Sequence, residues 1–328
     1  MQDATVRPEP TLQRKAAITT GRAQDHAGKV RVEPIPDFDL DRTIFKTLEG
    51  AVPRYVMRSR IAKEPHWDGA PAAEINQAYA AVAQTAPLPD VDPALLQFMA
   101  EECDFDVEHA DGSFLDHLYF CFEYTARHFP GHSPIVMLLH SILGTGTNTF
   151  AMTADKIDAL RAHLSPFEWA HIEAFPSVLR LLYDLPLRQE LRREQHRLDQ
   201  LLRIDFHRVI DDAPITLTAD ELWVQLNFQL IHLVDFLPVA NWGTHANETA
   251  FLVFRDLHDL LTQTGRLTAT VGAGPVGGRG LERETLPGLR ARLATRIPLS
   301  VSERMAARSV RQFSDRVGHS MAYTLSWG

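Results

Sequence analysis

The feature that most constrains the fold is a series of long segments whose apolar residues recur with helical spacing. Two of them, SFLDHLYFCFEYTARHF at 113–129 and SPIVMLLHSIL at 133–143, are apolar on most faces, which is typical of helices at the centre of a bundle. A third, at 218–240, begins with Thr218 and carries Glu221 three residues later, the pattern of a capping box. The sequence therefore predicts three central helices.

Strand-like alternation is nearly absent, and RLTATVG at 266–272 is the one short candidate. The charged stretch at 187–210 is expected to be amphipathic. DPALLQFMAEEC indicates a further helix, with Asp92 as its N-cap and Pro93 in its first turn. We therefore expect an all-α fold. Its predicted parts are a flexible arm at 1–35, a helical extension at 36–109, a helical core at 110–265, and a Gly-rich loop with a C-terminal helix at 266–328.

Composition excludes several classes of protein. The net charge of −9 argues against a nucleic-acid-binding surface as the main function. No stretch is apolar enough to span a membrane and the N-terminus lacks a signal-like apolar run, so we expect a cytoplasmic protein. The two cysteines, Cys103 and Cys121, are expected to be small buried apolar residues. The expected partner is a small molecule, with a homo-oligomer as an open possibility.

Histidines on the central helices are the candidates for chemistry. The chain has 15 histidines, and His117, His140, His171 and His232 fall on or beside segments expected to be buried. Asp235 follows His232 at a spacing of three, which places both residues on one helix face. Imidazole and carboxylate groups gathered from facing helices suit borderline metals such as iron or zinc.

Two other patterns in the sequence match parts of known functional motifs. Glu168 and His171 form a Glu-x-x-His pair, but a di-iron carboxylate site needs two such pairs and two further glutamates. Gly272-x-Gly274-x-x-Gly277 matches the dinucleotide fingerprint in letters alone, because no strand–helix–strand unit surrounds it. We therefore expect a loop at 272–280 and do not expect a di-iron centre.

SFLDHL, followed about twenty residues later by LLHSILGTGTNTF, resembles the opening half of the HD-domain superfamily. More closely, it resembles bacterial HD-like proteins in which His-Ser replaces the His-Asp pair. The resemblance covers roughly residues 110–260 and implies an HD-like helical bundle. It implies that His117 and His140 are the first and second metal ligands and that Asp235 is the terminal acidic ligand.

Ser141 departs from the superfamily pattern. A neutral serine hydroxyl cannot offset the charge of a dication or bridge two ions as an aspartate does. The sequence therefore predicts a mononuclear His/His/Asp site and disfavours a dinuclear one. The expected cofactor is a divalent metal, iron or manganese rather than zinc or magnesium. Candidate catalytic residues beside it are His171 and His232 as acid or base, and Ser141.

These expectations lead to two functional hypotheses. The first is a metal-dependent enzyme of the HD-like type that acts on a small metabolite, by hydrolysis or by oxidation. The second is a non-catalytic binding or scaffold protein whose HD-like core has lost its metal. The metal content of the purified protein distinguishes these two hypotheses.

Overall fold

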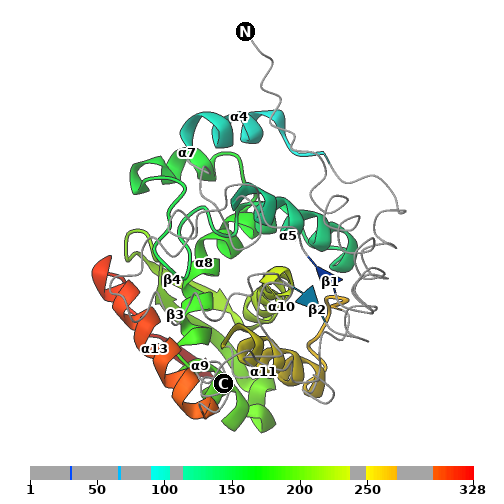
Figure 1. Cartoon of the computed structure of the whole chain (residues 1–328), viewed down its shortest axis with the longest axis vertical. Coiled ribbons are helices and arrows are strands. Elements are labelled where there is room, and N and C mark those ends of the chain that lie inside the picture. The colour runs from blue at the N-terminus through cyan, green and yellow to red at the C-terminus, as the bar shows by residue number, and fades with distance from the viewer. Residues whose placement is uncertain (1–29, 32–65, 68–89, 104–113, 237–248, 272–297) are drawn as a thin grey trace.

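The computed structural model describes residues 30–31, 66–67, 90–103, 114–236, 249–271 and 298–328 (Figure 1). Most of the predicted arm at 1–35, much of the helical extension at 36–109 and the Gly-rich loop at 272–280 lie outside these residues. Within them, helices account for 61% of the residues, beside one small three-stranded sheet. The predicted all-α class is confirmed to the extent that the described residues are mostly helical; the three-stranded sheet and a separate two-residue strand pair depart from it.

The helices and strands run in the following order along the chain. The α-helices are α4 (Pro93–Glu102), α5 (Phe114–His128), α6 (Ile135–Leu139), α7 (Ile157–Arg161), α8 (Pro166–Tyr183), α9 (Pro186–Arg193), α10 (Ala219–Phe236), α11 (Thr249–Gln263) and α13 (Leu299–Arg316). The 3-10 helices are η2 (Ala154–Lys156) and η3 (Gln195–Gln200). The strands are β1 (Val30–Arg31), β2 (His66–Trp67), β3 (Leu201–His207), β4 (Pro214–Thr218) and β5 (Thr324–Trp327).

Local capping explains why several helices begin where the sequence predicts. The Asp92 side chain accepts a hydrogen bond from the Ala94 amide at 2.9 Å, which starts α4. Thr218 and Glu221 form the expected capping box before α10, with the Thr218 amide 2.7 Å from the Glu221 carboxylate. These bonds satisfy amides that would otherwise lack partners in the first turn.

The small sheet corrects the sequence analysis. β3 lies between β4 and β5, and both pairs are antiparallel. The one predicted strand candidate, RLTATVG, is not a strand over its described residues 266–271. Instead, Asn227 of α10 holds this segment, because its side-chain oxygen accepts the amides of Thr268 and Ala269, each at 2.9 Å.

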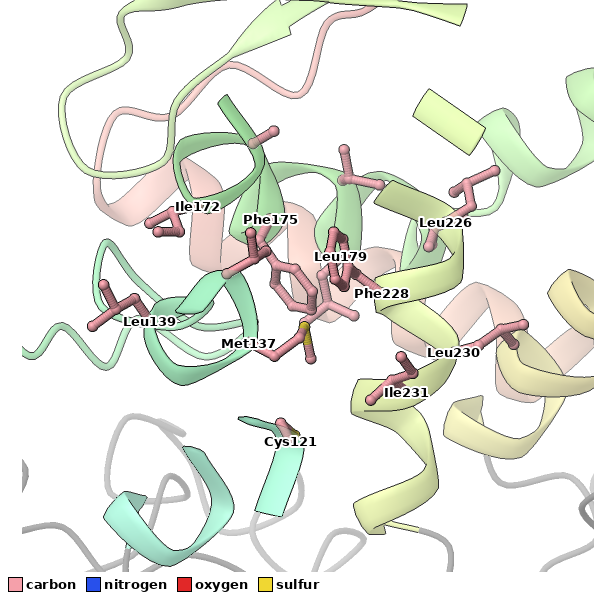
Figure 2. Packing of buried hydrophobic residues seen from close by; sticks show 14 of the residues in the cluster. Cys121, Met137, Leu139, Ile172, Phe175, Leu179, Leu226, Phe228, Leu230 and Ile231 are labelled. Atoms are coloured by element: carbon pink, nitrogen blue, oxygen red, sulfur yellow. The ribbon is translucent and has the colours of Figure 1, made fainter. Parts of the chain in front are cut away.

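The core surrounds α10, which contacts α5, α8 and α11 (Figure 1). α6 packs against α5 and α8, and Figure 2 shows apolar side chains of α6, α8 and α10 meeting around Phe175. No helix in the described part of the chain is both long and apolar enough to cross a membrane.

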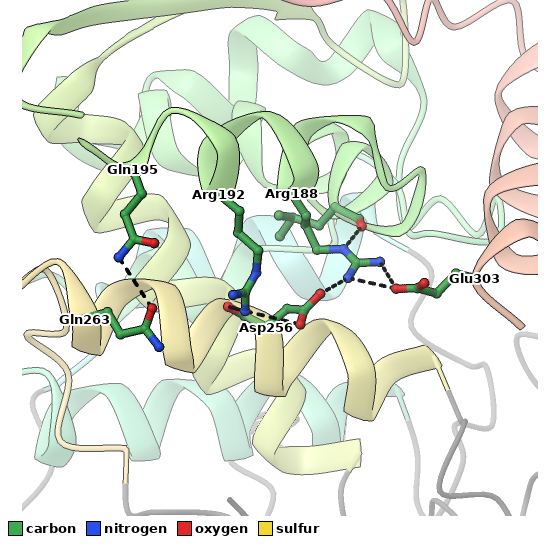
Figure 3. Close-up of polar contacts among 7 residues, drawn as sticks. Arg188, Arg192, Gln195, Asp256, Gln263 and Glu303 are labelled. Atoms are coloured by element: carbon green, nitrogen blue, oxygen red, sulfur yellow. Dashed lines mark hydrogen bonds and ion pairs between the residues drawn. The ribbon is translucent and has the colours of Figure 1, made fainter. Parts of the chain in front are cut away.

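A charged cluster ties α9 to α11 and α13 (Figure 3). Arg188 of α9 is buried and pairs with Asp256 of α11 and with Glu303 of α13. Its Nε also donates to the Leu182 carbonyl at 2.7 Å, and Arg192 donates to the Asp256 carbonyl at 2.9 Å. Because the Arg188 charge is buried and matched by carboxylates, the cluster fixes how these helices meet.

His319, after α13, gives the fold a predicted pH dependence. It is buried, with Nε2 3.0 Å from the His207 carbonyl and Nδ1 3.1 Å from the Ser314 hydroxyl. Burial lowers the pKa of His319 to about 4, and the positive charge of Arg180 also lowers it. The unfolded chain, with a histidine pKa of about 6.5, therefore binds more protons between pH 6.5 and 4, so stability falls as the pH drops through this window.

We expect His319→Gln to make stability less sensitive to acid. In urea unfolding at pH 7.5 and 4.5, wild type should lose more stability than the variant, by up to about 3 kcal/mol for this one group. Equal losses in the two proteins would contradict the assignment. His171→Gln serves as a second comparison, because burial also lowers the pKa of His171 to about 4.

Candidate metal centre

Three histidines from three different segments meet in the core. His117 lies on α5, His232 lies on α10, and His140 directly follows α6. Their ring centres are 4.9 Å apart for His117 and His140, 5.1 Å for His117 and His232, and 4.9 Å for His140 and His232. The interplanar angles are 76°, 77° and 70°. The imidazoles therefore form a nearly equilateral triangle with steeply inclined rings.

The ring centres of this triangle have the spacing of three imidazoles on one ion, whereas the group whose ligand atoms lie within 4.8 Å of one another contains His117, Cys121 and His140 and not His232. Three imidazoles that each bind one ion at about 2.0–2.1 Å, at roughly tetrahedral angles, have ring centres about 5 Å apart. Nε2 of His117 and Nε2 of His140 lie 3.0 Å from each other, at hydrogen-bond distance; on one tetrahedral ion the two nitrogens would lie about 3.4 Å apart. All three side chains are buried, with exposed fractions of 1%, 0% and 5% for His117, His140 and His232.

His140 is held in the form that binds metals. Its Nδ1 lies 2.7 Å from the Met137 carbonyl. A carbonyl can only accept, so Nδ1 carries the hydrogen and Nε2 keeps its lone pair in the neutral ring. Burial lowers the pKa of His140 to about 4, although the bond to Met137 opposes the shift. The ring is therefore neutral near pH 7, and its orientation is fixed as in many metal-binding histidines.

Cys121 is a site residue that the sequence analysis treated only as a buried apolar residue. It is fully buried on α5, one turn after His117, and its Sγ lies 3.9 Å from Nδ1 of His117. His117, Cys121 and His140 form a buried group that could hold a metal ion, with ligand atoms within 4.8 Å of one another. The spacing of four between His117 and Cys121 on a predicted helix was the available signal.

The structure brings some of the predicted ligands and acid–base residues together and places others apart. His117 and His140 lie together as expected, and His232, expected as an acid or base, joins them. Ser141 is buried beside His140, and its carbonyl accepts from the Gly144 amide at 3.2 Å. Asp235 lies in α10, but its side chain is outside the described residues.

His171 makes a separate set of contacts. Its described partners are Gln225, Phe167 and Phe228, and Gln225 precedes His232 by seven residues on α10. Glu168 does not form a metal-binding pair with His171, because its two carboxylate oxygens accept from Ser133 at 2.5 Å and from Ser165 at 2.8 Å. Glu168 thus serves as the capping-box residue of α8.

The segment GTGTN after His140 folds into a compact loop. Gly144 has φ +131°, and a Cβ there would lie 3.0 Å from a ring carbon of Phe150, so only glycine fits without a shift. The Thr145 hydroxyl accepts the amides of Thr147 and Thr149 at 3.2 and 3.0 Å. These short-range bonds fix the chain where it leaves the histidine centre.

Arg180 of α8 holds this loop from inside the core. Its Nη2 donates to the Thr145 carbonyl and to the Asn148 side chain, both at 2.7 Å, and its Nη1 donates to Ser314 of α13 at 3.0 Å. Arg180 is fully buried, and every partner of it in the described part of the chain is neutral. Burial lowers the pKa of Arg180 to about 10.

An apolar ring closes one side of the centre. Phe175 of α8 lies 4.6 Å from the His140 ring and 5.3 Å from the His232 ring, measured between centres. In Figure 2 Phe175 lies between α6 and α10. The three histidines thus form a buried, nitrogen-rich cluster with the sulfur atom of Cys121 at its edge.

No family model, curated protein or solved structure matches this chain.

Proposed function

We propose that this protein is a metal-dependent enzyme with a mononuclear centre held by His117, His140 and His232. The triangle of three imidazoles at 4.9–5.1 Å is the observation that carries the proposal. Three protein ligands are the usual number in catalytic zinc sites, which keep one position open, whereas structural sites are closed by four. A divalent ion bound there would act as a Lewis acid toward a small-molecule substrate.

The surrounding residues prepare the centre for this role. The bond from His140 to the Met137 carbonyl fixes which nitrogen faces the triangle. Phe175 excludes water from one side and lowers the local dielectric, which strengthens the polarising effect of a bound cation. His171, which was expected to act as an acid or base, contacts Gln225 and has no part in this proposal.

The donor atoms favour zinc or iron. Imidazole nitrogen and cysteine sulfur suit borderline and soft metals, whereas magnesium and manganese prefer oxygen ligands. Iron thus remains a candidate, as the sequence suggested, and zinc becomes one. Hydrolysis and oxidation both remain within the proposal; zinc at the site would leave only hydrolysis, because zinc has no redox chemistry, whereas iron would allow both.

Asp235 and the HD-like assignment also belong to this proposal. Asp235 follows His232 by three residues in α10, and a carboxylate there would complete the His/His/Asp set that the resemblance implies. The order of His117 on one helix, His140 at the end of the next and His232 on a late helix supports an HD-like arrangement.

A second candidate function is a structural metal site. The position of Cys121 favours it, because its thiolate with His117 and His140 would supply three of the four ligands of a closed site. His117 cannot be a ligand of the three-histidine site and of the site with Cys121 at the same time. Its Nε2 faces His140 and its Nδ1 faces Cys121, and one imidazole nitrogen binds one ion.

Metal analysis of protein purified without oxygen tests the proposal. We expect about one equivalent of zinc or iron per chain, as one three-histidine site requires. Cys121→Ser should retain that metal, because Cys121 lies behind the His117 ring in the proposed enzyme. In the cobalt-substituted protein, we expect no thiolate-to-cobalt charge-transfer band.

Two other outcomes would favour a different function for this protein. Loss of metal in Cys121→Ser, together with a cobalt–thiolate band in wild type, would favour the structural site. A protein that neither retains nor takes up zinc, iron, manganese or magnesium would be the metal-free binding protein that the sequence left open. Cys103→Ser is the matched control, because Cys103 is half-buried at the end of α4.

A further inference from the structure

A hollow of about 500 Å³ lies between α13 and the turn that joins α8 to α9. α13 packs against α8 (Figure 1). Small-molecule sites commonly have a volume of roughly 300–1,000 Å³, so the hollow has room for a ligand. Its walls include Arg304, Ala307, Arg308 and Arg311 of α13, and Leu185 and Pro186 at the start of α9. We call this hollow the arginine pocket.

The three arginines of the pocket lie on one face of α13. They are separated by four and three residues, so their side chains follow one another along two turns of the helix. Ala307, one residue before Arg308, is buried and carries only a methyl group, which leaves space between the longer side chains. Arg304 and Arg308 are exposed. The pocket thus combines an apolar floor with guanidinium groups that can turn toward a ligand.

The guanidinium groups of the pocket are not equally neutralised. Arg311 donates from its Nε to the Asp184 carboxylate at 2.5 Å. The Nε of Arg304 donates to the Ser300 carbonyl of its own helix at 3.0 Å, and no carboxylate in the described part of the chain pairs with Arg304 or Arg308. Like charges four residues apart on a helix repel each other. An anion between these two side chains would therefore relieve repulsion within α13 as it binds.

The carboxylates near the pocket either have partners or lie away from these two arginines. Glu303 precedes Arg304 in the sequence, but it pairs with the buried arginine of α9. Asp315 lies seven residues after Arg308, which is about 10 Å along α13. Glu190 lines a neighbouring hollow and accepts a hydrogen bond from a tyrosine hydroxyl at 2.7 Å. An anion therefore meets the least repulsion at the end of the pocket that Arg304 and Arg308 form.

We propose that the arginine pocket binds the phosphate group of a small phosphomonoester, with Arg304 and Arg308 as its main partners. A phosphomonoester carries about 1.5 to 2 negative charges near pH 7, which matches two guanidinium groups, whereas a carboxylate carries one. Guanidinium groups bind phosphate oxygens through two parallel hydrogen bonds. Gln189 and Gln312 also line the pocket and add neutral amide donors. The apolar walls accommodate the body of the ligand.

The pocket is separate from the histidine centre. Phe175 contacts the His140 and His232 rings, and Asp184 lines the pocket. These two residues of the α8 segment are nine positions apart, which is about 14 Å along a helix. Binding in the pocket is therefore expected whether or not a metal is bound.

Four probes test the chemistry of the ligand. Phenyl phosphate carries the proposed head group on an apolar ring, benzoate carries one negative charge on the same ring, benzyl alcohol is neutral, and inorganic phosphate has no apolar body. Binding is measured by calorimetry on the full-length protein at pH 7.5, in a buffer without phosphate or sulfate. We expect phenyl phosphate to bind more tightly than inorganic phosphate, and about tenfold or more tightly than benzoate or benzyl alcohol.

Matched variants separate recognition from net charge and from folding. Arg304→Gln and Arg308→Gln should each weaken the binding of phenyl phosphate about tenfold or more. Arg203→Gln removes the same charge from an exposed arginine of β3 and should leave binding unchanged. All three variants should unfold at nearly the wild-type urea concentration, because surface substitutions of this kind change stability little. Their metal content should equal that of wild type.

Four results would overturn the proposal. Phenyl phosphate could fail to bind, or it could bind no more tightly than benzoate or inorganic phosphate. Arg203→Gln could weaken binding as much as Arg308→Gln does, which would make the effect one of net charge alone. An oligothymidylate that binds through the same arginines more tightly than phenyl phosphate would make the pocket part of a nucleic-acid surface. None of these results bears on the histidine centre, whose own test is its metal content.

Discussion

His232→Ala is expected to lower the bound metal from about one equivalent per chain to a small fraction of it, as much as His117→Ala or His140→Ala does. Removing even an outer residue that orients a metal ligand typically costs 10–100-fold in affinity, and removing a ligand itself costs more. His232 is the informative position, because it completes the triangle of rings but does not belong to the group that contains Cys121.

The measurement combines metal content with stability. Metal bound only to the folded state stabilises it by about 2.7 kcal/mol when its free concentration is 100 times the dissociation constant. Added metal should therefore raise the unfolding midpoint of wild type and leave that of His232→Ala unchanged. His171→Ala is the matched control, since its contacts are with Gln225 and aromatic rings, and it should keep both the metal and the stabilisation.

Two results would contradict the three-histidine centre. Full metal retention in His232→Ala would remove His232 from the ligand set and leave His117, Cys121 and His140 as the site. Equal metal loss in His171→Ala would show that the loss reflects general damage to the core. Asp235→Asn, measured in the same way, tests the carboxylate that the HD-like resemblance implies.

The starts of several helices were predictable because their capping signals are local, whereas the helix expected at 133–143 is helical only over Ile135–Leu139. The caps at Asp92, Ser165 and Thr218 lie within three residues of the amides they bond. The sheet was not predictable in this way. β3 pairs with β5 from the end of the chain, so Leu201 lies opposite Trp327. In LLRIDFH two exposed residues interrupt the alternation of buried positions, and the alternating runs at 203–207 and in β4 are only five residues long, which leaves a weak period-of-two signal.

Part of the candidate site could also be predicted from local sequence signals. His117 and His140 stand in short, distinctive segments, so the sequence could single them out. The sequence predicts Asp235 as the third ligand and His232 as an acid or base; the contact of the His232 ring with His117 and His140 depends on which turn of α10 faces α5 and α6, and sequence spacing alone does not give that. The place of Cys121 beside His117 depends on ring orientation, which only tertiary packing sets.

Arg180→Met is expected to destabilise the protein by about 1–3 kcal/mol. Two effects oppose each other. The buried charge of Arg180 has no carboxylate partner in the described part of the chain, so its removal relieves a desolvation cost, which the lowered pKa of about 10 reflects. Against this, the Thr145 carbonyl, the Asn148 side chain and the Ser314 hydroxyl lose a charged donor. Ser314 keeps His319 as a partner and Asn148 is half-buried, so the Thr145 carbonyl is the buried acceptor left unpaired, at a cost of about 1–3 kcal/mol that exceeds the relief.

Graded variants test whether the bonds or the charge matter. Ser314→Ala removes one of the three acceptors and should cost about 1 kcal/mol in urea unfolding. Arg180→Lys keeps the charge, but a single ammonium cannot reach acceptors on both the loop and α13 in the planar geometry of a guanidinium. It should therefore lose nearly as much stability as Arg180→Met. A stable Arg180→Lys would show that the charge is what matters. Arg180→Met as stable as wild type would show that the loop after His140 is held by the bonds of Thr145 alone.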